Sequence, residues 1–372
     1  DRPGAPHLSA AVDRRPDTFR AVAANDPSGI DVHALRALTP GCEHVVHLNN
    51  AGASLPPAPV LDAVVGHLQL EASIGGYEAA REQAEADQRL YGAVAELVKA
   101  RPDQIAYADS ASRAWLAFFS GVARTLGPGD RILTGRAEYA SNALALLLAA
   151  ERTGCDVVVV PDDAHGQIDV GALAELLDER TRLVSLTHVP TNGGLVNPAV
   201  AVGEAIARSG SDAWYLLDAC QSAGQIDLDV TALGCDALTA TGRKYLRGPR
   251  GTGFLYVSDR ALQQVAPADI DLHSGTWTGD RTWAWADGAT RFELWECSVA
   301  GRIGLGVAVD HALEVGLPAI ELRVAALAAQ LRGALVELPA VTVHDKGETQ
   351  CGIVTFTVEG HDAAEVSERL RS

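Results

Sequence analysis

The sequence predicts an α/β protein with a mostly parallel sheet in a large domain and a smaller α+β domain after it. Three observations support this prediction. Short apolar strands alternate with amphipathic helical stretches through the middle of the chain, which is typical of open parallel sheets. The chain has 372 residues, more than the roughly 250 to 300 at which a single core stops growing. Near residue 260 the alternation gives way to a tryptophan-rich loop region.

The elements follow an N-terminal arm, residues 1–44, which is polar and rich in proline and arginine, with one short helix expected at Val32 to Leu38. The strands expected from apolar runs are Ile105 to Tyr107, Arg131 to Thr134, Val157 to Val160, Leu183 to Thr187, Trp214 to Leu217, Ala237 to Thr241 and Gly253 to Val257. The last of these follows a glycine-rich turn too closely for a helical crossover. It is therefore expected to run antiparallel to its neighbours.

The second domain is expected to span residues 261–372, after a large domain at 45–260. Its predicted order is the tryptophan-rich loop, helices at roughly 300–335, a strand at Ile353 to Val358 and the start of another helix. That last helix is cut short at Ser372, so further C-terminal residues are expected.

Charge and composition exclude several classes of partner. Thirty basic and 48 acidic residues give a formal net charge of −18, which repels nucleic acid and anionic membranes. No apolar run reaches the roughly 18 residues of a membrane span. The six cysteines form no CxxC pair, so neither a disulfide framework nor a zinc site is predicted. Reduced thiols in the cytoplasm fit this pattern.

Lysine is rare in this chain, which makes each one informative. The three lysines are Lys99 at the end of a helical segment, Lys346 in a polar loop, and Lys244. Lys244 lies in Thr-Gly-Arg-Lys-Tyr-Leu-Arg-Gly-Pro-Arg-Gly-Thr-Gly, a turn whose glycines allow close approach of a ligand. An amine flanked there by Arg243 is suited to act as a nucleophile and proton carrier. The alternative is a surface lysine in a basic turn.

A carboxylate ends one of the predicted central strands. Asp218 follows Trp214 to Leu217 in Trp-Tyr-Leu-Leu-Asp-Ala-Cys-Gln, and ligands of open α/β sheets bind at the carboxyl ends of their strands. A carboxylate at this edge can hold a pyridine nitrogen protonated. The alternative is that Asp218 caps the next helix.

Together the two segments resemble the class V aminotransferase family of fold-type I pyridoxal-phosphate enzymes, which includes cysteine desulfurases, carbon-sulfur lyases and isopenicillin epimerase-like proteins. The resemblance lies in Asp-x-x-Gln after a strand, a lysine 26 residues after the aspartate, and Gly-Pro-x-Gly-x-Gly. His47-Leu-Asn-Asn-Ala-Gly-Ala-Ser is similar to the family's opening motif, a strand and turn before the first large helix. The resemblance also implies that the large domain contains a sheet of about seven strands, as in the family.

The resemblance also implies roles for the matching residues. Lys244 is expected to form a Schiff base with pyridoxal 5'-phosphate, Asp218 to pair with the pyridine nitrogen, and Gln221 to hydrogen-bond the phenolic oxygen. The further expected cofactor contacts are Ala111, Ser112, Arg113, Thr241 and Arg243 to the phosphate, Tyr139 stacked on the ring, Thr191 or Asn192 at the ring oxygen, and Thr276 from the partner of a homodimer. Helix N-terminal amides at Ala111 to Arg113 suit a phosphate on physical grounds as well.

The chain departs from the family in two places that bear on the reaction. Arg291-Phe-Glu-Leu-Trp-Glu-Cys replaces the common Arg-Phe-Glu-x-Gly-Thr, which argues against an ordinary desulfurase. Four tryptophans, at 277, 283, 285 and 295, fit either an extended apolar substrate or packing between subunits. Cys220 and Cys351 do not occupy the desulfurase cysteine position, and Cys220 is expected to be a small packed residue.

These observations lead to one preferred function and two alternatives. The preferred function is a pyridoxal-phosphate lyase that cleaves a carbon-sulfur bond of a cysteine-derived, amino-acid-like substrate. An aminotransferase or epimerase would use the same proton abstraction at Lys244. A non-catalytic relative that keeps the fold as a binding subunit is the alternative from another class, and the intact Lys244, Asp218 and Gln221 weigh against it.

Overall fold

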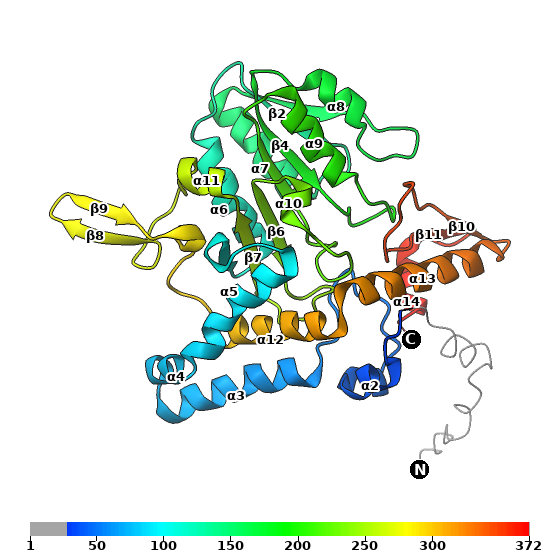
Figure 1. The fold of residues 1–372 in the computed structure, drawn as a ribbon. Coiled ribbons are helices and arrows are strands. Elements are labelled where there is room, and N and C mark those ends of the chain that lie inside the picture. Colours follow the sequence, from blue (N-terminus) through cyan, green and yellow to red (C-terminus); the bar gives the residue numbers. More distant parts are fainter. Residues whose placement is uncertain (1–27, 372) are drawn as a thin grey trace, which may run out of the picture.

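The computed structural model describes residues 28–371, which contain a seven-stranded sheet with helices on both faces (Figure 1). Its strands are β1 (Ile105–Ala108), β2 (Arg131–Gly135), β3 (Asp156–Val160), β4 (Thr181–Thr187), β5 (Trp214–Asp218), β6 (Ala237–Thr241) and β7 (Gly253–Val257). Their order in the sheet is β1-β7-β6-β5-β4-β2-β3. The strands from β6 to β3 pair in parallel, whereas β7 is antiparallel to both β1 and β6. The predicted fold class and the reversed β7 are confirmed.

Two hydrophobic cores cover the two faces of the sheet. Because successive residues of a strand point to opposite faces, Leu216 belongs to one core and Leu217 to the other. The first face carries α6 (Ala111–Ala123), α7 (Ala140–Thr153) and α11 (Asp259–Gln264). The second face carries α5 (Ala84–Val98), α8 (Val170–Leu176), α9 (Ala199–Ser209), α10 (Val230–Leu233) and α12 (Val299–Val315). The sheet is therefore the middle layer of three.

Two helices before β1 pack against α12. The elements of this N-terminal region are α2 (Val32–Ala37), η1 (Pro40–Glu43), α3 (Ala58–Ile74), α4 (Gly76–Glu82) and, before β1, η2 (Pro102–Gln104). The two helices that pack against α12 are α3 and α5. The short helix expected at Val32 is confirmed, and the rest of the predicted arm, 1–27, lies outside the described residues. The prediction of a strand in the opening motif is wrong. The residues from His47 to Asn49 form no strand, and after them Gly52 and Ala53 both donate to the Asn49 carbonyl and close a turn.

The tryptophan-rich region is a hairpin and not the predicted loop. β8 (Gly275–Gly279) pairs antiparallel with β9 (Thr282–Trp285), with Trp277 opposite Trp283, before η3 (Gly288–Phe292). The hairpin projects from the body of the molecule (Figure 1). Most of its side chains are exposed on both faces, so its sequence lacks the alternation of polar and apolar residues by which a strand is recognised.

The C-terminal part forms a smaller group of elements beside α12. These are α13 (Leu317–Val336), β10 (Val341–Val343), β11 (Phe356–Val358) and α14 (Ala363–Arg369), with β10 and β11 antiparallel. β11 begins three residues later than predicted, because Thr355 donates its N–H to the Asp345 carboxylate at 2.8 Å instead of to a strand. The division of the chain at residue 260 remains a prediction.

Helices α12 and α13 are separated by a sharp bend at Gly316. Among residues 28–371 no single helix has the length and apolar character needed to cross a membrane, and these two meet that test only as a pair bent by 79°. Most of α12 is buried against α3, α5 and the sheet.

Candidate active site

The carboxyl ends of two neighbouring parallel strands bring the predicted catalytic residues together. Asp218 is the last residue of β5, and Thr241 is the last residue of β6, which pairs with it. Lys244 lies in the turn that follows Thr241, and all three residues are buried. Asp218 is close enough to Lys244 to influence the pKa of its amine. The structure therefore brings the Asp218 and Lys244 segments together at one edge of the sheet.

Lys244 is the buried lysine of the described chain. Burial lowers the pKa of its amine, and Arg243 lowers it further, against the opposing effects of Cys220 and Asp218. A lowered pKa increases the fraction of neutral, nucleophilic amine. Lys99, by contrast, is exposed and pairs with Asp227 at 3.1 Å. The alternative of a surface lysine at position 244 is thus wrong.

Asp218 does not cap a helix, so the alternative role as an N-cap is wrong. Its Oδ1 accepts the Cys220 N–H at 2.9 Å, and its Oδ2 accepts a hydrogen bond from Asn142 at 2.9 Å. The segment after it forms a turn before α10. Both carboxylate oxygens are thus held by donors on the protein side of the site.

Gln221 and the N-terminal opening motif meet at one side of Lys244. The Gln221 amide donates to the Ala51 carbonyl at 3.1 Å, whereas its buried Oε1 has no partner among the described residues. Arg243 donates from its guanidinium to the Gly52 carbonyl and accepts the Ser54 N–H at 2.8 Å on its own carbonyl. A buried acceptor without a partner costs free energy, so Gln221 has unused capacity toward a ligand.

The start of α6 and the end of β6 meet at Gly253. This glycine is paired with Ala108 on one side and with Thr241 on the other. A Cβ added to it would lie 2.7 Å from the Ala111 nitrogen and 2.7 Å from the Ala240 carbonyl oxygen. Only a residue without a side chain therefore lets the α6 N-terminus approach Thr241 this closely.

The first turn of α6 supplies backbone donors next to Thr241. The leading N–H groups of a helix have no intrahelical acceptor, and the one at Arg113 is taken by Ser110 Oγ at 3.2 Å. The Arg113 guanidinium lies 3.8 Å from Asp269 in an exposed ion pair. Ala111 and Ser112 are therefore the better placed of the predicted anion-binding residues.

Replacing Gly253 by alanine is expected to weaken binding of an anion at this point. The new methyl group must displace the backbone of α6 or β6, and such overpacking costs about 1–3 kcal/mol. We expect a lower melting temperature and a cofactor affinity reduced by about tenfold, measured by thermal unfolding and spectroscopic titration. Gly333→Ala in α13, where an added Cβ meets no atom within 4 Å, is the matched control. Unchanged affinity in Gly253→Ala would show that the α6 N-terminus holds no phosphate.

Tyr139 lies at the same edge of the sheet, next to Asp218. It precedes α7 and is partly exposed, and its N–H donates to Glu138 at 2.8 Å and to Thr187 Oγ1 at 3.1 Å. Thr187 pairs with Asp218 across β4 and β5. This position suits an aromatic ring that covers one face of a planar ligand.

Thr191 and Asn192 lie in the exposed loop after β4, and the structure connects this loop to the C-terminal elements. Cys351 donates its N–H to the Gly194 carbonyl at 2.7 Å, and Lys346 donates to the Gly193 carbonyl at 2.7 Å. Neither predicted residue is buried with Lys244. Their contact with a ring oxygen stays a prediction.

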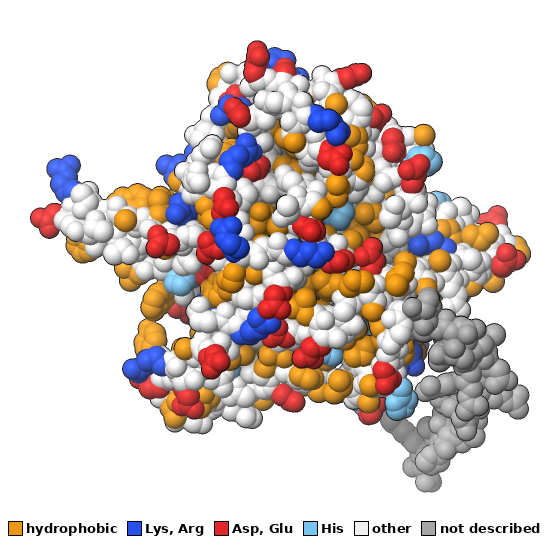
Figure 2. All heavy atoms as spheres, viewed as in Figure 1, with side chains coloured by type: hydrophobic (Ala, Val, Ile, Leu, Met, Phe, Trp, Pro, Cys, Tyr) orange, Lys and Arg blue, Asp and Glu red, His pale blue; other side chains and the backbone are white. Residues whose placement is uncertain are grey.

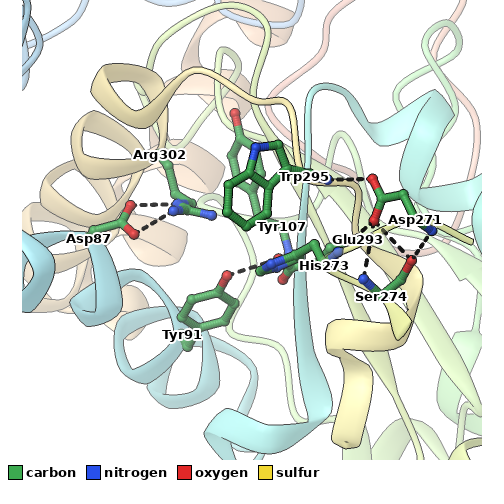
Figure 3. A network of polar contacts seen from close by, with 9 residues as sticks. All are labelled: Asp87, Tyr91, Tyr107, Asp271, His273, Ser274, Glu293, Trp295 and Arg302. Atoms are coloured by element: carbon green, nitrogen blue, oxygen red, sulfur yellow. Dashed lines mark hydrogen bonds and ion pairs between the residues drawn. The ribbon is translucent and has the colours of Figure 1, made fainter. Parts of the chain in front are cut away.

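Thr276 lies on the exposed hairpin, and the hairpin is anchored at its base by the buried carboxylate of Glu293 (Figure 3). Glu293 accepts the Tyr107 N–H at 2.8 Å, the Tyr91 hydroxyl at 3.0 Å, and a hydrogen bond from His273 at 2.7 Å. This bond raises the pKa of His273. The expected contact of Thr276 with the phosphate of a partner stays a prediction.

A second carboxylate, Asp271, completes the base of the hairpin. It accepts the Trp295 N–H at 2.7 Å and the Ser274 hydroxyl at 3.1 Å, while Arg302 and Asp87 form a buried ion pair nearby (Figure 3). Hydrophobic side chains lie along the hairpin, which projects at the left of the molecule (Figure 2). Trp277 is 76% exposed and Trp283 52% exposed.

Comparison with known proteins identifies the family. The model of the family described as Aminotransferase class-V matches residues 46–372. The chain belongs to this family. It is 30% identical over 352 residues to a cysteine desulfurase of Enterobacter sp. (strain 638), covering 88% of this chain and 81% of that one. It is 28% identical to a protein named "Probable cysteine desulfurase" from Methanothermobacter thermautotrophicus, covering 87% and 81% of the two chains.

A solved structure of the same fold supports the assignment. The complex between the cystine C-S lyase C-DES and its reaction product cysteine persulfide has a TM-score of 0.82 and 25% sequence identity, covering 90% of this chain and 89% of that one. The family membership predicted from the sequence motifs is confirmed.

The class V site of this chain fits the cofactor that the motifs predicted. Asp218 offers a buried carboxylate for the predicted contact with a pyridine nitrogen, and the Gln221 Oε1, which has no partner among the described residues, has free capacity for a polar ring substituent. The narrow approach of α6 to Thr241 at Gly253 leaves helix N–H groups for a phosphate. Lys244 supplies the buried amine.

Four participants of this class V site were missed by the sequence analysis. These are Glu138, Asn142, and the backbone carbonyls of Ala51 and Gly52. Glu138 precedes α7 and Asn142 lies in its first turn, so two polar side chains close together where a strand leads into a helix could have indicated a contact. The two carbonyls could not be predicted from the sequence, because every residue has a backbone carbonyl and its residue type does not indicate a binding role.

Proposed function

We propose that this class V protein is a pyridoxal 5'-phosphate-dependent lyase that cleaves a carbon-sulfur bond of a cysteine-derived substrate. The observation that carries the proposal is the buried Lys244 amine, whose pKa is lowered by burial, beside the buried Asp218. An acid-base group of this kind is needed to remove a proton from the substrate α-carbon.

Different residues of the chain are expected to bind the cofactor and to transfer protons. When bound, the cofactor supplies an electron sink that stabilises negative charge at the substrate α-carbon. Asp218 keeps the pyridine nitrogen protonated, and Ala111, Ser112 and Thr241 hold the phosphate. Lys244 would hold the cofactor through its amine and, once the substrate amine has replaced it there, would be free to accept the α-proton. The Lys244 ammonium would then give this proton to the sulfur leaving group as its bond to the β-carbon breaks.

Cys220 is poorly suited to accept sulfur from a substrate. Cys220 is close to Lys244 and Asp218, and burial together with the Asp218 carboxylate raises the pKa of its thiol well above the usual range. The thiolate is the nucleophile, so the raised pKa disfavours attack by this thiol. Cys351 is buried, and burial raises the pKa of its thiol as well. Within residues 28–371, no other cysteine affects the pKa of Lys244.

The second candidate is a cysteine desulfurase. The names of the relatives from Enterobacter and Methanothermobacter favour it, whereas the similarity to the cystine C-S lyase favours elimination. The two reactions differ in their carbon product, since elimination with uptake of water yields pyruvate, ammonia and a thiol or persulfide. Desulfuration yields alanine and transfers the sulfur to an enzyme thiol.

A product assay separates these reactions. We expect the purified protein with added pyridoxal phosphate to release pyruvate and ammonia in equal amounts from L-cystine or a cysteine S-conjugate. Alanine in place of pyruvate would support the desulfurase. Product formation only with an added keto acid would support an aminotransferase, and racemised substrate alone an epimerase. No change of any substrate would support a non-catalytic binding protein.

We also propose that the protein is a cytoplasmic homodimer whose sites are shared. The exposed Trp277 and Trp283 on a firmly anchored hairpin support a subunit contact, since aromatic residues are enriched at interfaces. In this arrangement Thr276 would reach the phosphate of the partner. The free state of all six cysteines supports a reducing compartment.

A further inference from the structure

A partly buried carboxylate next to the site is not used by the proposed mechanism. Glu138 follows β2, and its two oxygens accept hydrogen bonds from three strand hydroxyls, one backbone N–H and one side-chain amide. The donors are Thr134 Oγ1 at 3.0 Å, Ser185 Oγ at 2.9 Å, Thr187 Oγ1, the Tyr139 N–H at 2.8 Å and Asn142 Nδ2 at 3.1 Å. An ionised carboxylate only accepts hydrogen bonds, and here every partner is a donor.

Asn142 connects this carboxylate to Asp218. Its buried Nδ2 lies 3.1 Å from Glu138 Oε1 and 2.9 Å from Asp218 Oδ2. An asparagine amide nitrogen carries two hydrogens, so each carboxylate receives one. The orientation of the amide is fixed chemically, because the opposite orientation would direct its oxygen at two carboxylates.

The same carboxylate also positions Tyr139. The Tyr139 N–H is shared between Glu138 and Thr187 Oγ1, and Thr187 itself donates to Glu138. Through one side chain, Glu138 thus contacts the residue expected on the face of the cofactor ring and, through Asn142, the residue expected at the ring nitrogen. The hydrogen bonds of Glu138 and Asn142 therefore connect residues of β2, β4, β5 and α7.

From this geometry we infer that Asn142, supported by Glu138, is a positioning residue that orients the Asp218 carboxylate toward the cofactor's pyridine nitrogen. The inference rests on the proposed cofactor but not on which bond of the substrate is broken. Asp218 Oδ1 is held by the Cys220 N–H and Oδ2 by Asn142, so loss of Asn142 leaves the carboxylate free to rotate and one oxygen without its donor.

The alternative is that Asn142 only fills space at the start of α7. Substitution by leucine separates the two possibilities, because leucine keeps the branched shape of asparagine at Cγ but cannot donate a hydrogen bond. A packing role predicts that Asn142→Leu is milder than Asn142→Ala. A donor role predicts that the two variants are equally impaired. Ser141→Ala, one residue earlier and exposed, is the matched control.

The test measures cofactor binding without substrate. For each variant, pyridoxal phosphate is titrated into cofactor-free protein, and the visible band of the bound cofactor is recorded from pH 6 to 9. We expect both Asn142 variants to bind about 10- to 100-fold more weakly, which corresponds to the loss of one hydrogen bond to a charged group. We also expect the pH midpoint of the visible band to shift, which a defect in packing alone would not cause.

Binding and a band titration like those of Ser141→Ala would overturn the inference if Asn142→Leu is folded by circular dichroism. If it does not fold, Asn142→Asp replaces it. Its carboxyl donates only when protonated, so we expect its affinity to approach that of the wild type as the pH falls. Wild-type affinity at every pH would overturn the inference. Normal cofactor binding without pyruvate release would count against the proposed lyase and leave this inference intact.

Discussion

Replacing Lys244 by alanine is expected to abolish turnover and to remove the visible absorption band of the protein-bound cofactor. The residue provides both the amine that attaches the cofactor and the base that takes the substrate α-proton. Loss of a positioned proton-transfer group alone costs up to roughly 10⁴-fold in rate, and loss of the covalent attachment adds to this. Pyruvate formation and the absorption spectrum, measured on the same preparation, check the expectation.

Lys99→Ala provides the control for this variant. Lys99 forms an exposed ion pair with Asp227, and exposed pairs contribute only about 0–1 kcal/mol. Its loss should leave both the spectrum and the rate unchanged. Substantial turnover by Lys244→Ala would mean that another group removes the proton, and the site would need to be reassigned.

Asp218→Asn is expected to reduce the rate by about 10²- to 10³-fold while the protein stays folded. Asparagine keeps the shape of the side chain but removes the negative charge that holds the pyridine nitrogen protonated, and losses of this size follow removal of one preorganised electrostatic contact. The substitution also turns one of the two accepting oxygens of Asp218 into an amide nitrogen that faces a donor, so we expect the cofactor-free protein to lose about 1–3 kcal/mol of stability. The rate is measured by pyruvate release and the stability by thermal unfolding.

Asp169→Asn is the matched control for the charge change. Asp169 caps α8 by accepting the N–H groups of Gly171 and Ala172, a role that asparagine performs equally well. A rate for Asp218→Asn equal to that of this control would remove Asp218 from the mechanism.

The sheet could be predicted because each strand is an apolar run with its own boundaries. β7 was even assigned the correct direction, since the turn from Thr241 to Gly253 is too short for a crossover. The hairpin of β8 and β9 was missed because its residues are exposed on both faces, although Gly279 and Asp280 form a turn signal between Trp277 and Trp283.

The site was predictable where its chemistry is confined to a short motif. Asp218, Gln221 and Lys244 lie within one stretch of sequence, and the structure buries them together. Asn142 is 76 residues from Asp218, and nothing local to either residue indicates their contact. Such a bond depends on the pairing of β4 with β5 and on the placement of α7, which are properties of the folded chain.

Mapping the attachment of the cofactor tests the central claim most directly. Borohydride reduction of the protein with bound pyridoxal phosphate fixes the Schiff base as a stable secondary amine, and mass spectrometry of the digested protein locates it. With only three lysines in the chain, the result is unambiguous. We expect the modification on Lys244 alone, at one group per chain. A modification on Lys99 or Lys346, or none at all, would contradict the assignment of Lys244 as the residue that holds the cofactor.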